Sequence, residues 1–120
     1  MRVVLLIVAG LVCCRPAAAE TPWASVLTYL EPQERAIVHC QYEAGRRYAT
    51  DTCEPVATVI GAAISKCLPA EDTYTQAFHE NFPTLGSPGH LIEDFRDVAR
   101  QRLPSIVMDI RSATRRCRNG

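Results

Sequence analysis

Few residues in this 120-residue chain have the type and spacing that acid–base catalysis requires. His39 and Glu43 are four positions apart, so on a helix they would share one face and could hydrogen-bond. His79 directly precedes Glu80, and adjacent helical residues do not face each other. We expect a surface ion pair at the first place and a partly buried helix-end histidine at the second. A small hydrolase that uses His39 and Glu43 is the alternative.

Three carboxylates form a second cluster near the start of the last long segment. They are Glu93, Asp94 and Asp97. Two carboxylates held close together can act as general acid and general base. Acidic residues in the first turns of a helix also complement its dipole, which is a purely structural role. The sequence favours the structural role.

The cysteines are not spaced for a metal. No Cys-x2-Cys or His-Glu-x-x-His pattern occurs, which argues against zinc. Neither a glycine-rich phosphate loop nor a Gly-x-Ser-x-Gly turn is present. We therefore expect no cofactor, no metal and no enzymatic activity.

The first nineteen residues have the layout of a secretory signal peptide. Arg2 supplies a positive charge, an apolar run begins at Val3, and Ala17–Ala19 provides small residues for cleavage. The apolar run spans twelve residues, against the ~20 needed to cross a bilayer, so we expect no membrane span. The sequence predicts a leader at 1–19 and one domain at 20–120, in a periplasmic or secreted protein.

A lipid anchor on Cys13 or Cys14 is the second interpretation of this leader. Such sites generally carry a small residue before the cysteine, and here the preceding residues are Val12 and Cys13. Cleavage after Ala19 instead removes both cysteines and leaves four. An even number in an oxidising compartment indicates two disulfides. A domain of about 100 residues buries only roughly two thirds of its unfolded surface, so cross-links would help it fold.

The net charge gives no indication of a polyanionic ligand. The full chain has 13 basic and 13 acidic residues. Loss of Arg2 and Arg15 with the leader would leave 11 basic and 13 acidic residues, a formal charge of −2. A nearly neutral chain has no overall field that attracts nucleic acid or an anionic membrane.

Apolar residues recur at helical spacing along most of the domain, and no alternating strand pattern is longer than a few residues. The predicted helices are 21–30, 32–49, 55–68, 69–82 and 90–117, with a loop at 83–89. Pro104 should kink or split the last helix. The predicted fold class is all-α: a small disulfide-stapled bundle of about four helices.

Helix lengths restrict how the four cysteines can pair. Cys40 lies about 14 Å before the end of its helix and Cys67 about 18 Å into the next, so neither reaches Cys53. Antiparallel packing of these helices would bring Cys40 beside Cys67, which leaves Cys53 for Cys117. One straight final helix of about 40 Å would carry Cys117 past Cys53. Pro104 would then have to bend the path or the last turn fray; otherwise the second pairing is wrong.

Arginines crowd the C-terminus: Arg111, Arg115, Arg116 and Arg118. They could bind phosphate, lipopolysaccharide or an acidic partner, or they could stabilise the C-terminus of a helix. Arg46 and Arg47 allow the same two interpretations. Three aromatic residues could anchor a partner, although packing of the first short helix against the body is the favoured role. They are Trp23, Tyr29 and Tyr42.

One stretch resembles small exported immunity proteins that neutralise type VI secretion amidase effectors. Residues 40–45 (CQYEAG) and 53–55 (CEP) resemble the Cys-x-x-Tyr-x-x-Gly and Cys-x-Pro elements of that family. The first element is one residue short, and the long segment that ends near Cys117 has no obvious counterpart. The resemblance covers about fifteen positions and implies a protein that inhibits a toxic hydrolase.

Taken together, these features predict an exported helical protein that acts by binding. The expected ligand is a protein or an envelope component. The alternatives are an immunity or inhibitor protein directed at a toxic hydrolase, and a small hydrolase.

Overall fold

The computed structural model describes residues 22–115 and 117, and all regular secondary structure in these residues is α-helical. This confirms the all-α class, with five helices in the described part where about four were expected. The helices are α1 (Pro22–Tyr29), α2 (Glu31–Asp51), α3 (Val56–Lys66), α4 (Leu68–Asn81) and α5 (Gly89–Thr114). The predicted leader lies outside the described residues, as do Arg116 and Arg118.

Two of the helix boundaries are single-residue turns, and in each case the second residue of the new helix is a proline. Leu30 separates α1 from α2, and its carbonyl still accepts a hydrogen bond from the amide of Glu34. Cys67 separates α3 from α4, and its carbonyl accepts bonds from the amides of Ala70 and Glu71. Proline near the N-terminus of a helix removes an amide that would lack a partner there, so both new helices start without losing a hydrogen bond. The chain changes direction at each turn.

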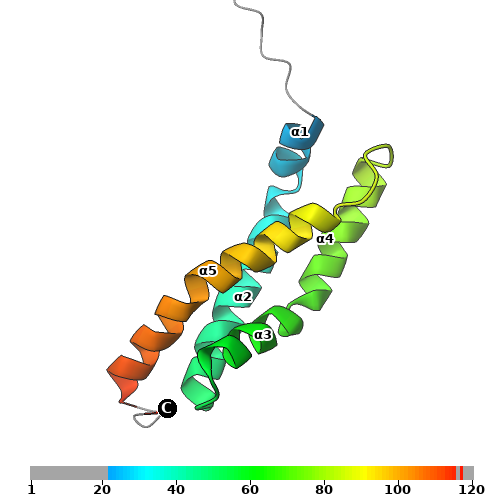
Figure 1. The fold of residues 1–120 in the computed structure, drawn as a ribbon. Coiled ribbons are helices and arrows are strands. Elements are labelled where there is room, and N and C mark those ends of the chain that lie inside the picture. Colours follow the sequence, from blue (N-terminus) through cyan, green and yellow to red (C-terminus); the bar gives the residue numbers. More distant parts are fainter. Residues whose placement is uncertain (1–21, 116, 118–120) are drawn as a thin grey trace, which may run out of the picture.

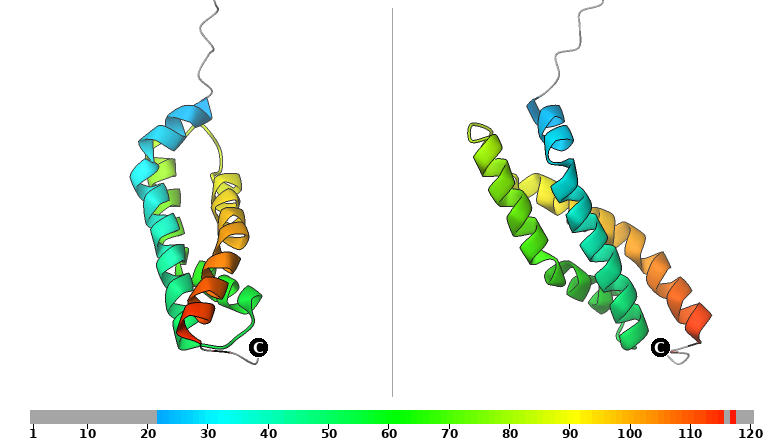
Figure 2. Two further views of the ribbon diagram at one scale, coloured as in Figure 1. Left: turned by 90° about the vertical axis from the view of Figure 1, so that its left-hand side faces the viewer. Right: turned by 180° about the vertical axis from the view of Figure 1, so that it is seen from behind.

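Helix α2 is the centre of the fold and contacts each of the other four helices. Figure 1 shows α5 along one side of α2, with α3 and α4 returning along another. The views in Figure 2 show α1 at the far end of the molecule from the last turns of α2 and α5. One core cluster contains Val26, Leu30, Ile37, Tyr74, Phe78, Leu91 and Ile92. The next contains Ala44, Ile60, Ala63, Ile64, Cys67, Ala99 and Leu103.

The first disulfide joins the middle of α2 to the turn between α3 and α4. Cys40 and Cys67 have Cα atoms 5.8 Å apart, and Cys67 is fully buried in the second core cluster. This is the pairing that antiparallel packing of the two helices predicts. The bond therefore fixes the height of α3 against α2 from inside the core.

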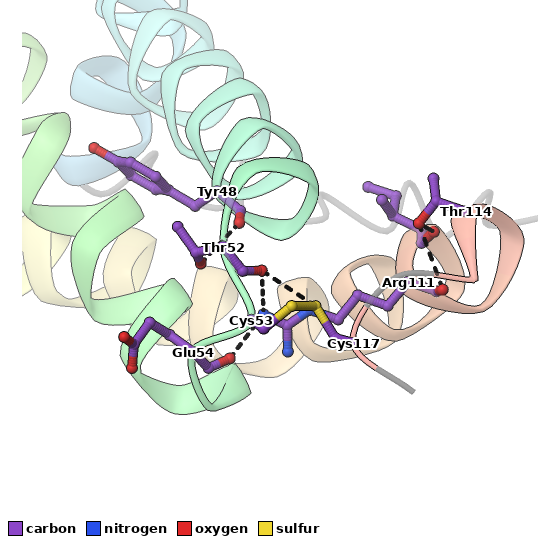
Figure 3. The surroundings of a disulfide bond; sticks show 8 residues. Tyr48, Thr52, Cys53, Glu54, Arg111, Thr114 and Cys117 are labelled. Carbon is purple, nitrogen blue, oxygen red and sulfur yellow. Dashed lines mark hydrogen bonds between the residues drawn. A yellow bond between two sulfur atoms is a disulfide. The ribbon is translucent and has the colours of Figure 1, made fainter. Parts of the chain in front are cut away.

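The second disulfide joins the loop after α2 to the residues after α5. The Cα atoms of Cys53 and Cys117 are 5.2 Å apart, and 64 positions separate them in the sequence. On the chain-entropy model, closing a loop of that length stabilises the fold by about 4 kcal/mol. Arg111 braces the same junction by donating to the carbonyls of Thr52 (3.1 Å) and Glu54 (2.7 Å), as Figure 3 shows.

The reach of Cys117 is explained by where α5 ends. The helix continues through Pro104 but stops at Thr114, so the predicted helical stripe does not extend to Cys117. Arg115 adopts a left-handed conformation with φ of 52°, and Cys117 also has a positive φ of 64°. Left-handed residues turn the chain out of the helix. The chain thereby leaves the helix axis before it would overshoot Cys53.

Two helical glycines differ in what surrounds them. A Cβ on Gly45 in α2 would come within 3.2 Å of the Leu103 side chain, so the glycine allows α5 to approach closely. A Cβ on Gly61 in α3 would meet nothing within 4 Å. Gly61 therefore lowers the stability of α3, and no packing contact with the described residues requires it.

We expect Gly61→Ala to raise the free energy of unfolding by about 0.5–1 kcal/mol, because alanine is the better helix former and has room. Gly45→Ala should raise the free energy of unfolding by less than Gly61→Ala does, or should lower it, because the Leu103 side chain must move. Urea unfolding of the oxidised variants measures both. Equal gains at the two positions would show that the contact between Gly45 and Leu103 is not tight.

Candidate functional site

A groove runs along the outer side of α2, where the N-terminal half of α5 adjoins it, and encloses about 620 Å³. Its apolar lining comes from Val38, Tyr42 and Phe95. Its charged and polar lining is Glu31, Glu34, Arg35, His39, Glu43 and Arg46, all from α2. We call these nine residues the α2 groove. An apolar floor with a few polar groups around it is the usual composition of a binding site.

His39 and Glu43 both line the α2 groove, but they do not bond to each other. Within the described chain no hydrogen bond reaches His39, whose side chain is exposed. Glu43 instead lies 4.0 Å from Arg46. The predicted surface pair is therefore not formed, and His39 lacks the carboxylate that would orient it as a general base. His79, expected to be partly buried, is exposed at the end of α4 with its ring against Phe78.

Glu34 is the groove residue with the most unusual surroundings. Its Oε1 atom is buried without a hydrogen-bond partner. Burial raises the pKa of Glu34 above its usual value, and the nearby negative charge of Glu31 adds to the shift. Tyr74, fully buried on α4, also has an unpartnered hydroxyl. Burial, with the charge of Glu34 as the second cause, raises the pKa of Tyr74 to about 12.

Two members of the acidic cluster on α5, Glu93 and Asp97, are paired with arginines of the same helix. Arg100 donates 2.7 Å hydrogen bonds to both Glu93 and Asp97. Arg96 adds a 3.3 Å contact to Glu93. The hydrogen bond from Arg100 is the main cause that holds the pKa of Glu93 below its usual range. A carboxyl kept ionised in this way cannot serve as a general acid near neutral pH.

A buried ion pair between α4 and α5 was not predicted from the sequence. Glu71 lies in the first turn of α4, yet only 4% of its side chain is exposed. Arg96 holds both of its oxygens, with Nε 3.0 Å from Oε1 and Nη2 2.5 Å from Oε2. The two residues are 25 positions apart, so no local spacing rule could have paired them.

The C-terminal arginines do not form one free cluster in the described part of the chain. Arg111 is committed to the carbonyls of Thr52 and Glu54. Arg115 is exposed where α5 ends. Arg46 and Arg47 of α2 lie 4.0 Å and 3.7 Å from Glu43 and Asp51 respectively. The predicted role of Arg111, Arg115, Arg116 and Arg118 in partner binding stays a prediction.

The three candidate anchor aromatics take different places. Trp23 is partly buried, with its ring 5.9 Å from that of Phe78 and 4.6 Å from that of His90, and so packs α1 onto the body. Tyr29 is 61% exposed and meets Phe82 edge-on. Tyr42 alone of the three lines the α2 groove.

The stretch that resembles the immunity family divides between structural and surface roles. Cys40 and Cys53 lie in different disulfides. Gly45 admits Leu103 against α2. Tyr42 is the motif residue that lines the α2 groove.

Searches against protein-family models, curated proteins and solved structures found no match to this chain. Among the described residues, no group of three or more His, Cys, Asp or Glu side chains is placed to hold a metal ion. None of the helices the structure describes is long and apolar enough to cross a membrane.

Arg96→Met should lower the free energy of unfolding by about 3 kcal/mol, because it leaves the Glu71 carboxylate buried without a partner. The double variant Glu71→Leu/Arg96→Met should recover most of this loss, since no charge is then buried. Chemical denaturation of both variants and the parent provides the comparison. A double variant no more stable than Arg96→Met would contradict the assignment.

Glu34→Gln should stabilise the protein at pH 7. The raised pKa means that the folded state binds a proton more tightly than the unfolded state, so stability is lost as pH rises from the usual value of 4.5 through the folded pKa. Glutamine mimics the neutral carboxyl and avoids that loss. Thermal melts of variant and parent across pH 3–8 should differ at pH 7 and converge below about pH 4. A constant difference would disprove the link to ionisation.

Proposed function

We propose that this protein is an exported, non-enzymatic binding module that holds another protein in the α2 groove. The observation that carries the proposal is the composition of that groove. Half-buried Val38, Tyr42 and Phe95 form its floor, and charged side chains of α2 surround them. Aromatic side chains in a rim of charged groups are typical of the centre of a protein–protein contact.

The surroundings of the cysteines, of His39 and of the carboxylates on α5 support a binding function rather than catalysis. All four cysteines of the described chain are in disulfides, so none of them is a nucleophile. Among the described residues no carboxylate bonds to His39, and Arg100 pairs with both Glu93 and Asp97. General acid–base catalysis needs positioned groups that can exchange protons near neutral pH.

The export part of the proposal rests on the disulfides and on the predicted leader. Structural disulfides persist in oxidising compartments, such as a periplasm or the extracellular space. The segment 1–19 would direct the chain to such a compartment. The first bond joins the middle of α2 to the turn between α3 and α4, and the second joins the loop after α2 to the residues after α5.

Inhibition of a toxic hydrolase is a second candidate function, and Tyr42 favours it. Of the five positions that carry the resemblance to the immunity family, Tyr42 is the one that lines the α2 groove. An inhibitor of this kind would place the α2 groove over its enzyme. This is a narrower form of the same proposal, with one partner of defined activity.

The test is capture of a partner from envelope extract by the oxidised protein, followed by titration with the purified partner. Tyr42→Ala should weaken the complex at least tenfold, because interface tyrosines are often energetic hot spots. Tyr29→Ala is the matched control, since Tyr29 is 61% exposed on α1 and lies outside the groove. Val38→Glu, which adds a charge to the groove floor, should also weaken binding and serves as the second groove variant.

Circular dichroism of each variant establishes that it is folded. Binding that is unchanged in both groove variants, or that is lost in Arg115→Ala instead, would refute the proposal and direct attention to the basic C-terminus. A hydrolase partner whose activity the parent protein inhibits would establish the second candidate function.

A further inference from the structure

The three carboxylates of the α2 groove differ in whether a positively charged side chain lies beside them. Glu31 forms an ion pair with Arg35, and Glu43 lies within 4.0 Å of Arg46. Glu34 has no cation partner among the described residues, and its Oε1 atom is buried without a hydrogen bond. The groove thus has three glutamates and two arginines, and the uncompensated negative charge belongs to Glu34.

Burial of an unpaired carboxylate is costly, and most buried carboxylates are paired. Glu71 in this same chain illustrates the usual solution, because Arg96 binds both of its oxygens. Glu34 lies on the stripe of α2 that also contains the buried residues Ile37 and Gln41, yet no arginine or lysine in the described part of the chain pairs with it. The unpaired carboxylate of Glu34 therefore destabilises the fold, and a ligand with a positive charge could relieve this destabilisation.

The neighbours of Glu34 in the groove suit a cation with an aliphatic stem. Val38 lies one turn along α2 and offers apolar contact. The rings of Tyr42 and Phe95 line the same groove. Aromatic faces attract cations, and the methylene groups of lysine or arginine pack on apolar surface while the charge is held at the tip.

We infer that the α2 groove receives a cationic side chain of a protein partner, with its charge against the carboxylate of Glu34 and its stem over Val38, Tyr42 and Phe95. This inference rests on the proposed function and specifies the chemistry of the partner. The charge imbalance of the groove selects for a basic residue.

The probe is Nα-acetyl-lysine amide, and the norleucine compound is its neutral counterpart. Titrations of the isotope-labelled oxidised protein, followed by amide chemical shifts, locate the binding site and compare affinities. We expect millimolar affinity for the lysine probe, as befits so small a ligand. Shifts should centre on Glu34, Val38 and Tyr42, and the norleucine compound should bind at least tenfold more weakly.

Glu34→Gln should lose the preference for lysine over norleucine while it stays folded, since it replaces only the charge. Glu54→Gln is the matched control: it makes the same change at an exposed loop position outside the groove, and it should keep the preference. Equal binding of the two probes, or a lysine preference that survives Glu34→Gln, would overturn the inference. The proposed function would still stand if Tyr42→Ala abolished partner binding in that case. Conversely, a lysine preference without any groove-bound partner would separate the two claims.

Discussion

The fold depends on two disulfides that fix α2 within the bundle. Cys40 ties the middle of α2 to the turn between α3 and α4, and Cys53, just beyond its end, ties it to the end of α5. A domain of this size has a limited core, so covalent closure of long loops adds stability that packing alone supplies poorly. Because each bond joins α2, or the loop directly after it, to a distant part of the chain, the bonds set the relative heights of the helices. The outer side of α2 is left as a groove.

Glu71 and Glu34, one fully and one partly buried, differ in whether an arginine neutralises them. Glu71 is fully compensated by Arg96, and the pair links α4 to α5. Glu34 is uncompensated, on the helix that lines the groove. Residues that serve binding are commonly not optimal for stability. The difference between the two carboxylates supports a structural role for Glu71 and a ligand-binding role for Glu34.

Much of the architecture could be predicted from the sequence because helical periodicity and helix length are local properties. They predicted an all-α fold and placed Cys40 opposite Cys67. The end of α5 could not be predicted, because the apolar stripe continues to Cys117 while the chain leaves the helix at Arg115. The Glu71–Arg96 pair depends on tertiary contact across 25 positions. Glu34 did leave a signal, as a charged residue on the inward stripe of α2, but only the packing of Tyr74 and Phe95 shows its surroundings.

The central claim is that the cysteines of the folded domain are oxidised in one particular arrangement, which creates the bundle and leaves it to act by binding. Peptide mapping of the purified protein under non-reducing conditions tests this most directly. We predict one cross-linked peptide pair that contains Cys40 and Cys67 and a second that contains Cys53 and Cys117. Free Cys40, or a bond between Cys40 and Cys53, would contradict the account.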